Sequence, residues 1–128
     1  MIKGFSLDIY DSDITFAWDT NEKELNAFFE QVEAPQEYRD MFWEKYNHSN
    51  VGALTTSYSS TNMFVVFRDE PNNKVAAHEL FHVAYNVLHH RGIEDEEAWA
   101  YLIGYLTEVF YDLYLDKVDT EKLSPKED

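Results

Sequence analysis

The chain begins with two short segments in which apolar and polar residues alternate. The apolar positions of residues 3–18 are spaced by two, in two sets: Phe5, Leu7 and Ile9, then Ile14, Phe16 and Trp18. A period of two is typical of strands that bury one face, and the polar triplet Asp11-Ser12-Asp13 between the sets favours a turn. Residues 3–18 therefore predict a β-hairpin.

Two segments with helical spacing follow. From about residue 22 to 33, apolar side chains recur every three or four positions after a possible cap at Thr20 or Asn21. Pro35 then interrupts the pattern, and a second segment, about 36–47, carries its apolar residues on one side. We expect two amphipathic helices here.

After Gly52 the composition shifts to Thr, Ser, Tyr and Val. Two β-type runs, about 53–58 and 62–68, flank the polar stretch Ser59-Ser60-Thr61. Residues that favour strands on both sides of a short polar turn predict a second hairpin.

Two long helices, about 74–90 and 94–116, complete the pattern. Arg91-Gly92 ends the first, and acidic residues begin the second, where the positive end of a helix favours them. The polar residues 117–128 are expected to form a frayed tail. The sequence thus predicts one α+β domain over residues 1–128, with a small antiparallel or mixed sheet from two hairpins packed on helices.

Composition narrows the range of partners. The 128 residues are 45% apolar, enough for one hydrophobic core, and 25 acidic against 10 basic residues give a net charge of −15. This charge repels phosphate backbones and anionic bilayers, so neither nucleic acid nor membrane is expected as a partner. The N-terminus lacks the apolar stretch of a signal peptide and no run is long enough to span a bilayer, so we expect a cytoplasmic protein.

The residues with the clearest chemical meaning are His78-Glu79-Leu80-Phe81-His82, a His-Glu-x-x-His motif within a predicted helix. Helical residues four apart share a face, so both imidazoles can bind one zinc ion while Glu79 acts as base on the metal-bound water. The chain has no cysteine, so any metal ligands are nitrogen and oxygen atoms. A chance coincidence of two surface histidines with a Glu is the alternative.

A catalytic zinc site needs a third protein ligand, and acidic candidates begin the last predicted helix. The segment Glu97-Ala98-Trp99-Ala100-Tyr101-Leu102 resembles the second helix of gluzincin metallopeptidases, and in particular of small minigluzincin-type proteins of phages and bacteria. The resemblance covers Val75 to about Tyr105. It implies that His78, His82 and Glu97 bind one zinc ion between the two helices, with Glu79 as the base.

Helix geometry leaves a second choice for the third ligand. In a tight antiparallel pair turning at Gly92, a rise of about 1.5 Å per residue places Glu97 level with Leu88, not with His82. The same pairing places Glu108 near His78. Glu97 is preferred on the resemblance, and Glu108 remains the alternative.

Two further features bear on catalysis. Tyr101, four residues after Glu97, is a candidate catalytic residue whose phenol can stabilise an oxyanion, and Tyr85 has a comparable position after His82; ordinary packing is the alternative for each. The run 62–67 resembles the edge strand that lines the cleft of such peptidases, where an extended peptide can add to the sheet. A buried strand without a ligand fits the same run.

The leading hypothesis is a zinc-dependent metallopeptidase or amide hydrolase that acts on a peptide or protein. The alternative is a catalytically inactive gluzincin-like interaction or accessory protein, such as one encoded by a phage. A carboxylate-bridged di-iron protein fits less well, because that chemistry uses two Glu-x-x-His motifs and the chain has one.

Overall fold

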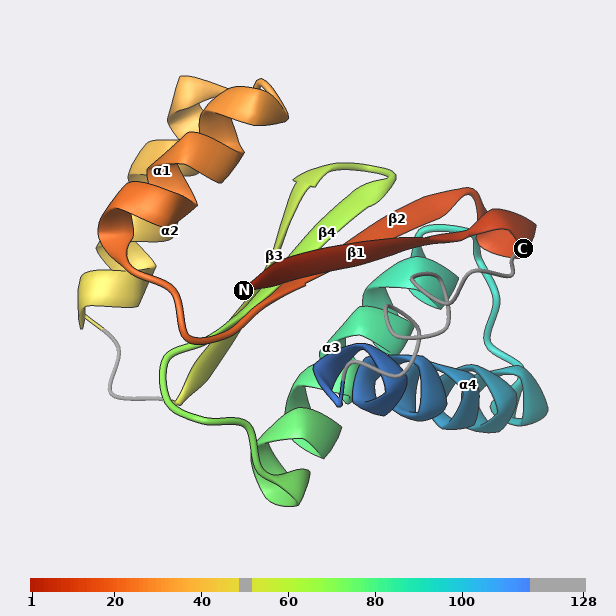
Figure 1. Cartoon of the computed structure of the whole chain (residues 1–128). Coiled ribbons are helices and arrows are strands. Elements are labelled where there is room, and N and C mark those ends of the chain that lie inside the picture. The colour runs from red at the N-terminus through yellow and green to blue at the C-terminus, as the bar shows by residue number, and fades with distance from the viewer. Residues whose placement is uncertain (49–51, 116–128) are drawn as a thin grey trace, which may run out of the picture.

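The chain forms a hairpin, two helices, a second hairpin and two further helices, in the order that the apolar pattern predicts (Figure 1). The computed structural model describes residues 1–48 and 52–115, so the predicted tail, 117–128, lies outside the described residues. The elements are β1 (Ile2–Leu7), the short 3-10 helix η1 (Asp8–Tyr10), β2 (Ser12–Ala17), α1 (Glu22–Gln31), α2 (Gln36–His48), β3 (Ala53–Ser59), β4 (Asn62–Phe67), α3 (Asn73–His89) and α4 (Glu96–Tyr114). Among the described residues, none of the helices combines the length and apolar character needed to cross a membrane.

The four strands form one mixed sheet in the order β1-β2-β4-β3. Each hairpin is antiparallel, and the two hairpins meet through the parallel pair β2 and β4, in which Thr15 lies opposite Phe64. The strands at the two edges are therefore β1 and β3. Of the two interpretations of the run 62–67, the edge strand is wrong and the buried strand is confirmed, because β4 has a neighbour on both sides.

Helices cover both faces of the sheet, α1 and α2 on one face and α3 and α4 on the other (Figure 1). Successive residues of β4 point to opposite faces: Met63, Val65 and Phe67 join the core under α3 and α4, and Phe64 and Val66 join the core under α1 and α2. Strands that are buried on both faces have continuous apolar sequences instead of alternating ones. The apolar run of β4 thus reflects a central strand.

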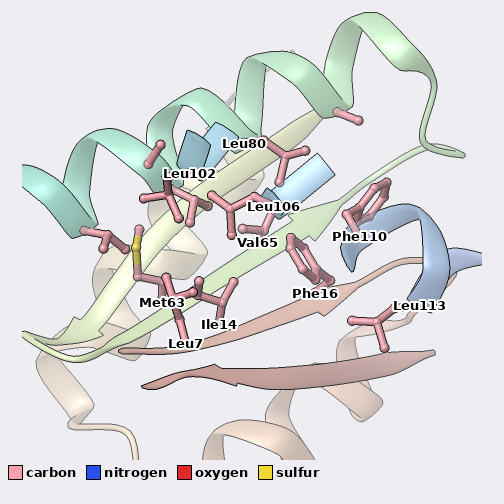
Figure 2. Close-up of a cluster of buried hydrophobic side chains, with 14 of the residues drawn as sticks. Leu7, Ile14, Phe16, Met63, Val65, Leu80, Leu102, Leu106, Phe110 and Leu113 are labelled. Carbon is pink, nitrogen blue, oxygen red and sulfur yellow. The ribbon is translucent and has the colours of Figure 1, made fainter. Parts of the chain in front are cut away.

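The core between the sheet and the last two helices positions the His-Glu-x-x-His helix (Figure 2). Leu80 of α3 and Leu106 of α4 are fully buried in it. Phe110 of α4 packs edge-on against Phe16 of β2 at 5.0 Å between ring centroids, and lies 5.3 Å from Phe67 of β4. Burial of each large apolar side chain contributes about 1.5–3 kcal/mol, so α3 is held firmly against the sheet.

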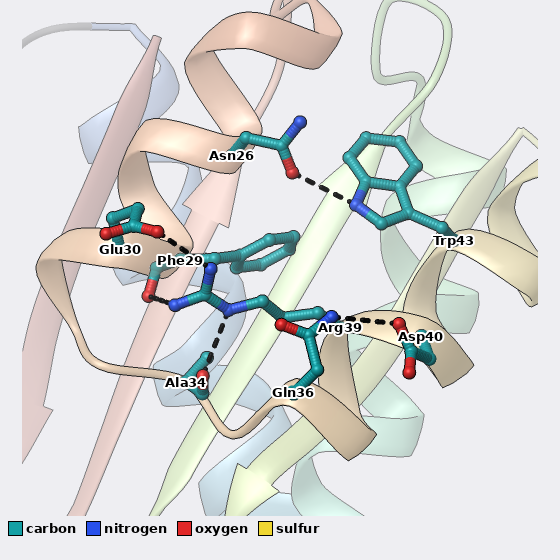
Figure 3. A network of polar contacts seen from close by, with 8 residues as sticks. All are labelled: Asn26, Phe29, Glu30, Ala34, Gln36, Arg39, Asp40 and Trp43. Carbon is teal, nitrogen blue, oxygen red and sulfur yellow. Dashed lines mark hydrogen bonds and ion pairs between the residues drawn. The ribbon is translucent and has the colours of Figure 1, made fainter.

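On the other face, Arg39 of α2 joins the two first helices (Figure 3). Its guanidinium donates hydrogen bonds to the backbone carbonyls of Phe29 and Ala34 and forms an ion pair with Glu30 at 3.1 Å. Carbonyl groups at the end of a helix lack partners within the helix, and a basic side chain can satisfy them. Arg39 therefore ties the end of α1 to the start of α2.

Caps and a glycine fix the ends of α3 and α4. The Asn72 side chain accepts a hydrogen bond from the backbone N–H of Val75 at 3.0 Å, and Asp95 caps α4 in the same way. After α3, Gly92 has φ of 69°, a left-handed conformation that favours glycine, and its N–H donates to the carbonyl of His89 at 3.0 Å. The turn predicted at Arg91-Gly92 is confirmed.

Candidate functional site

His78 and His82 lie side by side on α3, as their spacing predicts. Their Nε2 atoms are 3.1 Å apart and their ring centroids 4.7 Å apart. Two Zn–N bonds of about 2.05 Å that meet at a tetrahedral angle separate the nitrogens by about 3.3 Å, close to the observed distance. The same separation also fits an N–H···N hydrogen bond between the two rings. The pair is thus arranged to share one atom, either a metal ion or a proton.

Glu79, the next residue, is rotated by about 100° around the helix axis from His78 and is buried beside β3 of the sheet. The side chain of Glu79 is 7% exposed, whereas that of His78 is 67% exposed. The hydroxyl of Thr55 on β3 donates a hydrogen bond to Oε1 of Glu79 at 2.5 Å, and Oε2 lies 3.9 Å from Nε2 of His78. Burial of a carboxylate is costly unless donors satisfy it, so Thr55 helps to keep Glu79 in place.

Thr55 is the site residue that sequence reasoning missed. The signal that would have found it is the period of two along β3: Ala53 belongs to the core under α3, so Thr55 faces α3 as well. Thr56 faces the other way and contacts Tyr38 of α2 at 2.5 Å. The sequence could not show that α3 lies against this edge strand.

Two adjoining hollows lie between β3 and α3. One, of about 530 Å³, is mainly apolar and is lined by Gly52, Ala53, Lys74, Val75, Ala77, His78 and Glu79. The other, of about 310 Å³, is lined by Ala53, Leu54, Thr55, His78, Glu79, His82 and Asn86. His78 and Glu79 belong to both, so the motif residues face a shallow groove beside the edge of the sheet.

The predicted third ligand does not join the histidine pair. Within residues 1–48 and 52–115, no three His, Cys, Asp or Glu side chains come together in a group that could hold a metal. Glu97 and Glu108 are both exposed on α4. Trp99, two residues after Glu97, packs against Tyr85 at 5.7 Å, as expected if Glu97 lies nearer the α3–α4 turn than His82 does. The described side chains therefore do not form the three-ligand centre predicted between α3 and α4.

The two tyrosines lie in different surroundings. Tyr101 is 77% exposed and lines a separate hollow of about 390 Å³ with residues of β1 and η1, whereas the two hollows at His78 are not lined by it. Tyr85 packs between neighbouring rings, stacked on His89 at 5.1 Å and an interplanar angle of 10°. Tyr85 thus takes the packing role, and the oxyanion role of Tyr101 stays a prediction.

Comparison with protein-family models, with curated proteins and with solved structures finds no match for this chain. The resemblance to gluzincins therefore rests on the motifs of α3 and α4.

Proposed function

We propose that the protein is a zinc-dependent hydrolase of peptide or amide bonds, with its site on α3 beside the edge strand β3. The observation that carries this proposal is the combination of two imidazole nitrogens 3.1 Å apart with a buried carboxylate on the adjacent residue. Neutral imidazole is a common zinc ligand, and a zinc ion supplies a bound water of lowered pKa. His78 and His82 are the proposed ligands.

Glu79 is the proposed base. Thr55 holds its Oε1, and its Oε2 is the oxygen nearer to His78. A proton taken up during hydrolysis would be held at Oε2 and passed to the leaving amine. The hydrogen bond from Thr55 orients the carboxylate for this task, since it leaves one defined oxygen facing the histidines.

Strand β3 is the proposed binding edge for a peptide substrate. It pairs with β4 on one side, and its other edge borders the groove that contains His78 and Glu79. An extended peptide can add to an edge strand through main-chain hydrogen bonds, which places its carbonyl groups in register with the strand. The edge strand proposed to bind the peptide is thus β3, residues 53–59, and not the run 62–67.

The third ligand rests on the resemblance alone. We retain Glu97 for this position, which requires the start of α4 or the Glu97 side chain to move toward His82. We also retain Tyr101 as the residue that stabilises the oxyanion, which likewise requires the start of α4 to move toward His82. The expected cytoplasmic location also stays a prediction.

A binding protein without turnover is the second candidate, and a specific observation favours it. Among the described residues, no three His, Cys, Asp or Glu side chains form a group that could hold a metal, and catalytic zinc sites normally have three protein ligands. In that case the chain keeps the gluzincin helices as a scaffold, and the groove beside β3 binds a partner that is not cleaved.

Zinc binding is the first test. Calorimetric titration of zinc into the metal-free full chain should give one site, which is lost in His78→Ala and in His82→Ala. His48→Ala is the matched control, because His48 is exposed on α2, on the other face of the sheet. If the control weakens zinc binding as much as the two test variants do, or if wild type binds no zinc, the site is wrong.

Hydrolysis is the second test. With a library of unstructured peptides, Glu79→Gln should keep zinc affinity and lower the rate of cleavage by at least about a hundredfold, the usual contribution of a general base. Mass spectrometry of the products gives the rate and the cleaved bond. A wild type that binds zinc and cleaves no better than Glu79→Gln would favour the binding protein.

A further inference from the structure

Another hollow, about 530 Å³ in volume, lies where α3 ends and α4 begins. It is lined by Tyr85, His89, Ile93, Glu94, Glu96 and Trp99. None of these residues is a proposed metal ligand or base. The hollow nevertheless lies near the histidine pair, because Tyr85 follows His82 by three residues, about 4.5 Å along the helix axis.

Aromatic rings form one wall of this hollow. Tyr85 meets Trp99 edge-on at 5.7 Å, and Phe81, one turn earlier on α3, also packs against Trp99 at 5.4 Å. Phe81 and Tyr85 are 47% and 42% exposed, although large apolar side chains are usually buried. The rings hold one another in place, so a ligand that packs on them loses little side-chain entropy.

Negative charge forms the other wall. Glu94 and Glu96 are exposed beside the rings. Arg91, the nearest arginine or lysine along the sequence, is directed elsewhere, since its guanidinium donates to the carbonyl of Asp11 and the hydroxyl of Ser12 at the turn of the first hairpin. In the part of the chain that the structure describes, the hollow is thus lined by two carboxylates and by no arginine or lysine, in a chain whose net charge is −15.

We propose that this hollow binds an arginine side chain of a peptide. A guanidinium group packs on the ring of Trp99 and pairs with carboxylates through a planar set of donors, so it matches both walls at once. Tyr85 is stacked on His89 and supports Trp99. An anion would be repelled by Glu94 and Glu96, and an apolar group would bury the two carboxylates without a partner. The ligand chemistry thus follows from the combination of rings and acids.

This assignment deepens the proposed function and, as a statement about substrate, rests on it. A peptide that lies along β3 and crosses the histidine pair has successive side chains about 3.3 Å apart along its length. An arginine within a few residues of the cleaved bond can then reach the hollow at Tyr85. The proposed enzyme would accordingly prefer substrates with arginine near the cleavage point.

The binding test uses the metal-free full chain and needs no catalysis. Acetylated and amidated Ala-Ala-Arg-Ala-Ala is compared with the same peptide carrying citrulline, a neutral residue of nearly the same shape, by calorimetry and tryptophan fluorescence. Two rim carboxylates and the ring contact should make the arginine peptide bind about tenfold more tightly. Glu94→Gln with Glu96→Gln should remove this difference.

The matched control is Glu37→Gln with Glu44→Gln, the same change of charge on exposed residues of α2, on the opposite face of the sheet. The control should retain the preference for arginine. Equal affinity for the arginine and citrulline peptides, no measurable binding of either, or an equal loss in both double variants would overturn the proposal. Circular dichroism of each variant confirms that the fold is retained.

The experiments can refute either proposal without refuting the other. Preference for arginine in the metal-free chain without any cleavage in the zinc-loaded chain would leave the hollow as a docking site and refute the hydrolase. Cleavage that depends on Glu79 without any preference for arginine would refute the hollow and leave the hydrolase standing.

Discussion

The hydrogen bond between Thr55 and Glu79 gives the sharpest test of how the site is built. Thr55→Val keeps the shape of the side chain and removes the hydroxyl that donates to the buried carboxylate. A hydrogen bond to a charged group contributes about 1.5–3 kcal/mol to the free energy of unfolding. Leaving the buried acceptor without its donor lowers the free energy of unfolding by about the same amount. We expect the free energy of unfolding to fall by about 2 kcal/mol, which for a chain of this size lowers Tm by about 7 °C.

Urea unfolding at pH 7 measures this loss, and a double-mutant cycle assigns it to the pair. Glu79→Met replaces the carboxylate with an apolar group of similar length, and Thr55→Val with Glu79→Met removes both partners. Because an apolar pair leaves neither group unsatisfied, the double variant should be more stable than the sum of the single changes predicts, by about 1.5–2 kcal/mol.

Thr107→Val is the matched control, since Thr107 donates only to the carbonyl of Ile103 within its own helix, at 2.7 Å. It should change the free energy of unfolding by less than about 0.5 kcal/mol. A coupling energy between Thr55 and Glu79 below about 0.5 kcal/mol, or an equal loss in the control, would refute the view that β3 holds the proposed base.

Two further predictions concern other parts of the fold. Gly92→Ala should lower the free energy of unfolding by about 1 kcal/mol, because an alanine is strained at φ of 69°, whereas Gly104→Ala, inside α4 with open space around it, should raise it by up to about 1 kcal/mol; urea unfolding of both variants checks the opposite signs. Burial raises the pKa of Tyr38 to about 12, so from pH 10 to 12 the unfolded chain releases this proton before the folded chain does, and stability falls as the pH rises. Unfolding of wild type and Tyr38→Phe at pH 9, 10 and 11 should show a shallower fall in the variant, and parallel curves would contradict the role of Tyr38.

Local patterns sufficed to predict the order of the elements. The alternating residues Phe5 and Leu7 of β1 and Ile14 and Phe16 of β2, and the turn at Gly92, depend on neighbours along the chain, and these features are confirmed. The prediction that Ile9 continues the first strand is wrong, because it lies in η1 and is 81% exposed. The status of β4 depends on residues far away, because the parallel pairing of Thr15 with Phe64 makes it central. The apolar run 62–67 was compatible with either position, and only the sheet order distinguishes them.

In the candidate site, too, some features follow from the local sequence and others from contacts between distant elements. The pairing of His78 with His82 follows from helix geometry alone, and the two side chains are adjacent in the structure. Thr55 comes from another element, so its contact with Glu79 could not be read from the motif. The predicted ligand Glu97 depends on the angle and offset between α3 and α4, which buried residues such as Leu106 set and which no local pattern specifies.

The sheet order has a consequence for how the protein reaches its folded state. Each half of the chain is a hairpin followed by two helices, and a half-turn about an axis parallel to β2 and β4 would exchange the hairpins and the faces that their helices cover. Neither half is self-sufficient, since the inner edge of β2 meets its partner only when β4 is in place. During synthesis the sheet can therefore close only after β4, which ends at Phe67, has left the ribosome, and α3, which carries the site, follows it along the chain.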